Sequence, residues 1–217
     1  MKFLFIYCEG KTEEAFVERI LAPYFKEMNV FVTPSKPKGV SNFETMKKDL
    51  TGFCLSYPNS LVTTMIDYYG LQKIIPRLIP SEGDIYKRAQ TVEENVKNEL
   101  QALNNLYFNM ILHEFEGLLF SDINAFEGIA SKSQLLALRN TLRRADNNPE
   151  RINDKYETAP SRRILEQIPE YSKIRNGVEI AQRIGVTKIA DECQHFRQWI
   201  GRLSAWAKGG SMGNGRS

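Results

Sequence analysis

The passage from a buried strand to an amphipathic helix at the N-terminus constrains the fold more than any other feature of the sequence. Residues 2–8 (KFLFIYC) form an apolar, β-prone run without full polar alternation, which is typical of a strand buried on both faces of a parallel sheet. Apolar residues then recur at helical spacing from Phe16 to Tyr24. We expect Thr12 to cap this helix and Pro23 to end or kink it.

The alternation of strand and helix patterns continues to about residue 120. It predicts strands at 30–33, 60–66 and 107–113 and helices at 43–55, 91–103 and 114–120. The Pro/Gly-rich stretch from Tyr68 to Gln90 is expected to be a long loop. This order of elements is typical of a small, mostly parallel α/β sheet flanked by helices.

The strand signal fades after Ser121, and the rest of the chain has helical patterns. Helices are predicted at 132–145, 160–168, 175–186 and 189–206. The expected organisation is an α/β core over 1–125, a helical C-terminal part packed on it over 126–208, and a flexible tail over 209–217.

Composition excludes several classes of protein. Of the 217 residues, 42% are hydrophobic and 25% are charged, which is typical of a soluble globular chain. No run of about 18 apolar residues occurs, so we expect no membrane span and no membrane partner. The first apolar run ends at Glu9, too early for a signal peptide, and we expect a cytoplasmic protein. The net charge of +3 by itself predicts neither nucleic-acid nor membrane binding.

The cysteines and histidines argue against a soft-ligand metal site. Cys8, Cys54 and Cys193 are widely spaced and odd in number, so buried reduced thiols are expected rather than a disulfide or a zinc site. His113 and His195 are the only histidines, which nearly excludes a histidine-based metal site. His113 is a candidate ligand or proton shuttle, or a hydrogen-bonded structural residue.

Acidic residues follow three of the predicted strands. Glu9 follows the first strand, Asp67 follows the third, and Glu114 and Glu116 follow the fourth. Sites in open α/β sheets form beyond the carboxyl ends of the strands, so these carboxylates converge if the strands are neighbours. Such a cluster persists by sharing protons or by binding a cation, and oxygen ligands favour Mg²⁺ or Mn²⁺. The alternative for any single acid is a solvated group at a strand end.

The triplet Gly10-Lys11-Thr12 resembles a phosphate-binding loop only in its letters. It has no partner glycine five residues earlier, because the preceding residues form the strand, and the adjacent acids repel a phosphate. Lys11 is a candidate for a phosphate contact across a bound metal, or a surface lysine. Glu13 and Glu14 are interpreted as helix-start residues rather than as ligands.

A second candidate region is TAPSRRI, residues 158–164. Pro160 suits the first turn of a helix, and either Thr158 or Ser161 is available as its cap. This region is therefore expected to open the second helix of the C-terminal part.

Two arginines in that first turn are candidates for phosphate binding. Arg162 and Arg163 lie where the helix dipole disfavours cations, and a bound anion would reverse the effect. A guanidinium fork also binds phosphate well. The alternative is a salt bridge to a nearby acid, either Glu157 or Glu166.

Other basic residues are further candidates for contacts with a polynucleotide. Lys36 and Lys38 lie in a basic Pro/Gly/Ser loop and could contact a phosphate backbone, or remain surface lysines. Arg139, Arg143 and Arg144 lie at helical spacing and could extend a basic face, or form a solvated charged face.

Four motifs together resemble a known family. They are EGKTEE (9–14), DYYGL (67–71), HEFEGLLF (113–120) and TAPSRRI (158–164), and HFRQW (195–199) is similar to that family's closing helix. The chain resembles the bacterial domain-of-unknown-function family numbered 4276, which is assigned to the Toprim (topoisomerase–primase) superfamily. The matches occur in the family's order over roughly the first three-quarters of the chain.

The Toprim resemblance implies a Rossmann-type sheet with an acid after the first strand and a DxD pair after a later one. Glu9 matches the first acid, and Asp67 matches the first Asp of the pair. Tyr69 stands where the second Asp is expected. Glu114 or Glu116 could supply the missing carboxylate.

The residues and the resemblance together predict a Mg²⁺- or Mn²⁺-dependent phosphodiester hydrolase, a nuclease of the Toprim type. The predicted catalytic residues are Glu9, Asp67 and Glu116, and these three with Glu114 are the predicted metal ligands. The resemblance implies DNA or RNA as the substrate. It also implies an ATPase of the ABC or overcoming-lysogenization-defect type as a partner, with a role in phage defence. The alternative is a non-catalytic interaction or sensor subunit of a larger ATPase-containing complex.

Overall fold

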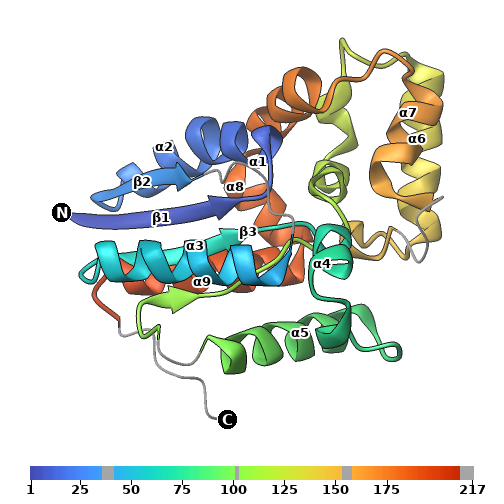
Figure 1. Cartoon of the computed structure of the whole chain (residues 1–217). Coiled ribbons are helices and arrows are strands. Elements are labelled where there is room, and N and C mark those ends of the chain that lie inside the picture. Colours follow the sequence, from blue (N-terminus) through green and yellow to red (C-terminus); the bar gives the residue numbers. More distant parts are fainter. Residues whose placement is uncertain (36–41, 101–102, 153–157, 211–217) are drawn as a thin grey trace.

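The centre of the molecule is a four-stranded sheet in the order β2–β1–β3–β4, with every neighbouring pair parallel (Figure 1). This is seen in a computed structural model that describes residues 1–35, 42–100, 103–152 and 158–210. The strands are β1 (Lys2–Cys8), β2 (Val30–Ser35), β3 (Leu61–Met65) and β4 (Leu106–Tyr107). The predicted parallel α/β sheet is therefore confirmed.

Each face of the sheet packs on its own set of helices, because successive residues of β1 point to opposite sides. Leu4, Ile6 and Cys8 enter one buried cluster, and Tyr7 enters the other. The first cluster includes α1 (Lys11–Phe16), the π-helical turn η1 (Val17–Leu21), α2 (Ala22–Lys26), α8 (Val178–Glu192) and α9 (Gln194–Ala207). The second includes α3 (Phe43–Ser56), α4 (Tyr68–Ile74), η2 (Pro76–Leu78) and α5 (Ile85–Glu99).

Between β4 and α8 the chain forms short helical turns and a two-helix hairpin. In chain order these are η3 (Phe115–Ser121), η4 (Ile123–Phe126), α6 (Lys132–Arg144), η5 (Pro149–Arg151), α7 (Pro160–Gln167) and η7 (Lys173–Gly177). The side chain of Gln134 in the first turn of α6 donates to the backbone carbonyl of Gln167 at the end of α7, so the two helices run in opposite directions. This α6–α7 hairpin stands to one side of the sheet, at the right of Figure 1.

The strand predicted at 107–113 is wrong for most of its length. β4 has two residues, and beyond it a single bridge joins Ile111 to Asp67. The cause lies between them, where the Thr64 hydroxyl accepts from the backbone N–H of Asn109 at 2.9 Å and donates to its carbonyl. A side chain thereby takes the hydrogen bonds that a strand ladder would use.

The long loop predicted from Tyr68 to Gln90 is also wrong. This stretch contains α4, η2 and the start of α5. Leu71, Ile75 and Ile85 are each at most 6% exposed, and their burial decides the local structure. The prolines and glycine that suggested a loop fall mainly between the helices, where they do not interrupt them.

Two expected helix signals at the N-terminus differ from the structure. Gly10, rather than Thr12, is the N-cap of α1, and Thr12 lies within the helix. Pro23 lies in the first turn of α2, directly after the π-helical turn, so helical structure continues past it. Near the C-terminus, α8 is kinked at Gly185, where φ is 78°, and ends before Cys193 rather than at residue 186.

The three thiols are free and buried, as predicted. Burial raises the pKa of each, that of Cys54 to about 11, so all three remain protonated at neutral pH. Among the described residues, no helix combines the length and apolar character needed to cross a bilayer.

Candidate functional site

The structure brings Glu9 and Asp67 together at one edge of the sheet. β1 and β3 are parallel neighbours with Cys8 paired to Met65, so the residues that follow them emerge side by side. The Glu9 Oε2 atom accepts a hydrogen bond from the backbone N–H of Asp67 at 2.9 Å. Gly70 in the first turn of α4 leaves space for this carboxylate, because a Cβ there would lie 2.4 Å from Glu9 Oε2.

Asp67 in turn connects to the segment that carries the other two predicted acids. Its Oδ1 atom accepts from the backbone N–H of Phe115 at 3.0 Å. His113 precedes that segment in the left-handed region, with φ of 62°, and its Nε2 atom lies 3.1 Å from the carbonyl of Glu150. The turn at His113 thus delivers Glu114 to the same edge as Asp67.

Glu114 points at the N-terminus of α7. Its Oε2 atom accepts from the backbone N–H of Ser161 at 3.1 Å. Pro160 lies in the first turn of α7, as predicted, but the N-cap is Ala159 rather than Thr158 or Ser161. Anion binding was one of two alternatives for this helix end, and the group found there is the Glu114 carboxylate of the same chain.

The predicted phosphate-binding cations are only partly placed by the structure. Arg163 pairs with Glu166 at 3.5 Å, which was the alternative to phosphate binding, and Arg162 is exposed in the same turn. Lys11 is exposed at the start of α1, two residues after Glu9. Lys36 and Lys38 lie outside the described residues, as does Glu157.

Glu116 is fully buried and pairs with a lysine that no motif in the sequence indicated. Lys173 of η7 lies 3.1 Å from each carboxylate oxygen of Glu116. The two residues are 57 positions apart in the chain, so no local motif could have linked them. Lys173 is therefore part of the site only because η7 packs against η3.

Glu13 is a second residue that sequence reasoning set aside. It is 7% exposed in the first turn of α1, and a Cβ on Gly10 would lie 3.0 Å from its Oε2 atom. A helix-start glutamate normally faces solvent, so this burial marks Glu13 as part of the site. The signal in the sequence was its position just after a buried strand that already ends in an acid.

These carboxylates act on one another strongly. The pKa of Asp67 is raised well above its ordinary value by burial and then by the charges of Glu13, Glu9, Glu116 and Glu114. Burial likewise raises the pKa values of Glu9, Glu13 and Glu116. Burial disfavours the charged form of Lys173, but Glu116 and Glu114 outweigh it and raise the pKa of that lysine. The site therefore concentrates negative charge with little built-in compensation.

The oxygen atoms of these carboxylates are suitable ligands for a hard divalent cation. All the acceptors are carboxylate oxygens, which Mg²⁺ and Mn²⁺ prefer. In their present positions, no three His, Cys, Asp or Glu side chains of the described chain are grouped closely enough to hold one ion. Each of Glu9, Asp67, Glu114 and Glu116 is instead turned toward a donor of the protein itself.

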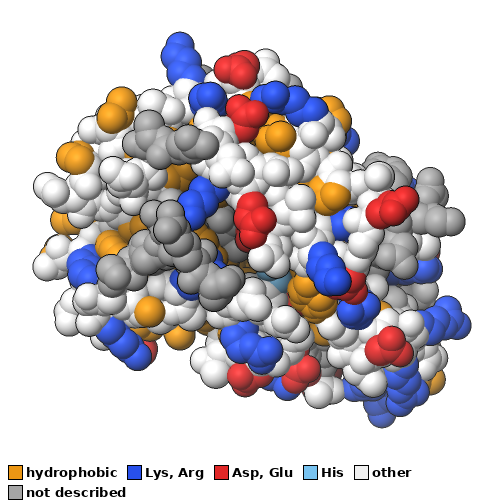
Figure 2. Space-filling view, turned by 90° about the horizontal axis from the view of Figure 1, so that it is seen from below, with side chains coloured by type: hydrophobic (Ala, Val, Ile, Leu, Met, Phe, Trp, Pro, Cys, Tyr) orange, Lys and Arg blue, Asp and Glu red, His pale blue; other side chains and the backbone are white. Residues whose placement is uncertain are grey.

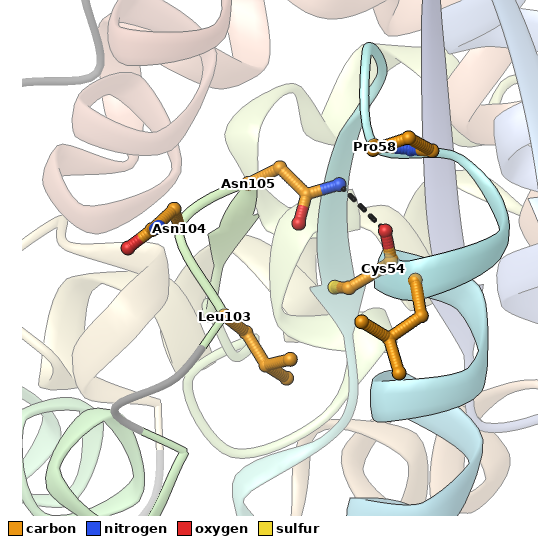
Figure 3. Close-up of a pocket in the computed structure, with 6 residues that line it drawn as sticks. Cys54, Pro58, Leu103, Asn104 and Asn105 are labelled. Atoms are coloured by element: carbon orange, nitrogen blue, oxygen red, sulfur yellow. Dashed lines mark hydrogen bonds between the residues drawn. The ribbon is translucent and has the colours of Figure 1, made fainter.

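A separate hollow of about 350 Å³ lies far along the sheet from these acids (Figure 3). It is lined by Cys54, Leu55, Pro58, Leu103, Asn104 and Asn105. The Asn105 amide donates to the backbone carbonyls of Cys54, Tyr57 and Ser60 at 3.0–3.2 Å, which closes the C-terminal end of α3. These Asn105 contacts serve the fold, so the carboxylates are the candidate functional site.

The fold and the site define a parallel α/β protein with a carboxylate cluster at its strand ends. The chain belongs to the family described as "Domain of unknown function (DUF4276)", whose model matches residues 8–204. The family resemblance drawn from the four motifs is thereby confirmed.

Two solved structures similar to this chain are C-terminal regions of OLD proteins. The one from Burkholderia pseudomallei is 17% identical with a TM-score of 0.47, and the match covers 95% of this chain and 99% of that chain. The one from Xanthomonas campestris pv. campestris, phased with iodine, is 16% identical with a TM-score of 0.39, over 93% and 97% of the two chains. A comparison with curated proteins gave no match.

Proposed function

We propose that this protein is a metal-dependent phosphodiester hydrolase, a nuclease of the Toprim type. The observation that carries the proposal is the convergence of Glu9, Asp67 and Glu114 at one sheet edge, with Glu13 and Glu116 beside them. A cluster of this charge is costly to fold unless it serves a cation or a reaction.

Each carboxylate has a distinct part in this proposal. Glu9, Asp67 and Glu114 or Glu116 would hold Mg²⁺ or Mn²⁺, which supplies charge neutralisation at the phosphodiester and orientation of a water nucleophile. Glu9 is also the candidate base for the proton of the attacking water, and its Oε2 atom accepts the backbone N–H of Asp67. Burial raises the pKa of Glu9, which makes its carboxylate a stronger base than an exposed glutamate.

The test is metal-dependent cleavage of a mixed panel of DNA and RNA substrates with Mn²⁺. The wild type is expected to cleave at least one substrate, and Glu9→Ala is expected to lose activity by about 100-fold or more. Glu18→Ala removes an exposed carboxylate from the same helical stretch and is the matched control. If neither the protein alone nor the protein with a partner ATPase shows metal-dependent cleavage, the proposal is wrong.

A second candidate function is supported by two observations at the same site. Tyr69 occupies the position of the second acid of a DxD pair, and Lys173 already neutralises Glu116. Both features suit a protein that keeps the fold without the reaction. It would then be an interaction or sensor subunit beside an ATPase in a larger complex, including one for phage defence.

The two candidates separate in one experiment. A Lys173→Met variant removes the internal cation from Glu116. The nuclease proposal expects Mn²⁺ binding by the wild type, measured by calorimetry, to be lost in Glu9→Ala and retained or strengthened in Lys173→Met. A non-catalytic subunit would bind no Mn²⁺ in any of the three proteins.

A further inference from the structure

Helix α6 carries charge of only one sign. Its 13 residues (KSQLLALRNTLRR) include four cations and no acid. The net charge of the whole chain is +3, so the rest of the chain sums to −1. In α3 and α5, by contrast, acids and bases occur in equal numbers. Helix α6 therefore has the largest positive charge of the described helices, with four cations, against two in α9, which also lacks an acid.

Two of these cations, Lys132 and Arg143, share one exposed stripe; Arg144 is exposed beside it, and Arg139 is half-buried and donates to the Asn124 side chain. Lys132, Leu136, Asn140 and Arg143 follow one another at spacings of four, four and three residues, which places them in a single stripe, and all four are exposed. Leu138 is fully buried on the opposite side. The stripe is about 16 Å long at the helical rise of 1.5 Å per residue, which matches roughly five phosphates of one DNA strand.

Helix stability alone does not explain this face. Arg143 and Arg144 in the last turn gain from the helix dipole, but Lys132 lies in the first turn, where the dipole disfavours a cation. The first turn contains no acid. Leu136 is 52% exposed in the middle of the stripe, where it gives the helix no packing. An apolar side chain among cations is suited to a partner with both phosphates and sugars or bases.

The hairpin directs the C-terminal end of α6 toward the carboxylate site. α6 runs antiparallel to α7, so its C-terminal arginines lie at the end of the hairpin where α7 begins (Figure 1). In the first turn of α7, the backbone N–H of Ser161 donates to the Glu114 carboxylate. Figure 2 shows several Lys and Arg side chains at the lower right, with Asp or Glu side chains among them, on the side of the molecule that carries the hairpin. A chain lying along α6 would therefore be led toward the acids.

We propose that the exposed face of α6 binds the phosphate backbone of a nucleic acid and guides the strand to the carboxylate site. The proposal rests on the proposed function, because it takes nucleic acid as the substrate of that site. It adds the surface that holds the substrate, which the carboxylates themselves would repel.

The test measures binding without chemistry. Fluorescence anisotropy in EDTA follows labelled duplex DNA, single-stranded DNA and RNA over a series of KCl concentrations. The variant Lys132→Gln/Arg143→Gln/Arg144→Gln is expected to weaken binding about tenfold or more. It should also reduce the slope of log K against log salt by about 2 to 3. All three residues are exposed, so the variant should keep the circular dichroism spectrum of the wild type, and the lost dipole interaction of Arg143 and Arg144 should lower Tm by only a few degrees.

The matched control is Lys48→Gln/Lys87→Gln/Lys97→Gln. These exposed lysines lie on α3 and α5, and their removal changes the net charge by the same amount. The control is expected to keep the salt slope of the wild type. Equal losses in the two variants, or no loss in the α6 variant, would overturn the proposal. So would a wild type that binds no nucleic acid, or one whose α6 face binds an acidic polypeptide such as polyglutamate instead.

The outcomes also separate this proposal from the nuclease proposal. If α6 controls binding in EDTA and no substrate is cleaved with Mn²⁺, the binding surface stands and the nuclease proposal fails. If substrates are cleaved and the α6 variant binds and cleaves like the wild type, the nuclease proposal stands and the surface assignment fails.

Discussion

Two groups of buried carboxylates in this protein are stabilised in opposite ways. Glu150 is 4% exposed and accepts from three neutral donors. Its two oxygens accept from the backbone N–H groups of His195 and Phe196 at 3.0–3.1 Å, at the N-terminus of α9. The Tyr86 hydroxyl donates to Oε2 at 3.0 Å. These hydrogen bonds and the dipole of α9 compensate the charge of Glu150.

The strand-end carboxylates have far less compensation. Five carboxylates repel one another here: Glu9, Glu13, Asp67, Glu114 and Glu116. At Glu9, the cations that lower the pKa are Lys73 and Lys173. Each acid has one or two donors, but the group as a whole repels itself. The comparison indicates that Glu150 serves the fold, whereas the strand-end charge exceeds what folding needs. Charge of that kind is typical of a functional site.

The largest effect on stability is expected at the lone carboxylate. Glu150→Ala leaves the N-terminus of α9 and the Tyr86 hydroxyl without their acceptor, and the free energy of unfolding should fall by about 3 kcal/mol or more. Urea denaturation measures it. Glu170→Ala, at an exposed position, should change it by less than about 0.5 kcal/mol. Equal urea midpoints for the two variants would show that Glu150 does not have this structural role.

The next prediction separates a glycine of the site from a glycine of the fold. In Gly70→Ala the new methyl would meet the Glu9 carboxylate at 2.4–2.6 Å, so Glu9 must move. We expect at least tenfold lower cleavage or Mn²⁺ affinity, with a cost of about 1–3 kcal/mol in stability.

The control for this prediction is Gly52→Ala in α3, where nothing lies within 4 Å of the added methyl. It should raise the free energy of unfolding by about 0.5–1 kcal/mol, as expected for alanine in a helix interior. Unchanged metal affinity in Gly70→Ala would show that Glu9 is not held in place by this glycine.

The sequence predicts the parts of this molecule that depend on local patterns. The apolar run at 2–8 and the acid that follows it place Glu9 at a strand end, and the structure pairs it with Asp67 as parallel topology requires. The short β4 could not be foreseen, because the Thr64 side chain interrupts the ladder. Burial of Leu71 likewise turned an apparent loop into a helix.

The rest of the site depends on contacts between distant segments. Lys173 reaches Glu116 only through the packing of η7 on η3, and Ser161 meets Glu114 only because α7 begins there. Glu13 was assigned to the helix start by a sound local rule, and its burial is a tertiary effect. No periodicity or motif encodes these neighbours, so they require the structure.

A pH-dependent prediction concerns His195, on the Glu150 side of the comparison. Burial disfavours its charged form, but the bond to Glu93 at 3.1 Å, with Glu150 and the Met110 carbonyl nearby, outweighs this and raises its pKa. A raised pKa stabilises the fold at pH values below the ordinary pKa of about 6.5. This contribution is lost as the pH rises through the higher value in the folded protein.

The measurement is the difference in unfolding free energy between pH 6 and pH 8. It should be smaller in His195→Gln than in the wild type, by about 1.4 kcal/mol for each unit by which the pKa is raised. Glu93→Gln removes the cause of the shift and should reduce the same difference. A wild-type difference that both variants leave unchanged would assign the pH dependence to other groups.

The smallest expected effect on stability is at the strand ends, and it tests the comparison most directly. Asp67→Asn keeps an oxygen for the backbone N–H of Phe115 and removes an ionisable carboxyl group from a self-repelling cluster. Its free energy of unfolding should be unchanged or higher by up to about 1 kcal/mol, while metal-dependent activity is lost. Glu150→Gln makes the same acid-to-amide change where the charge is compensated, and should lose about 1–3 kcal/mol. If Asp67→Asn loses as much as Glu150→Gln, the strand-end carboxylates are structural groups like Glu150, and the excess charge does not mark a functional site.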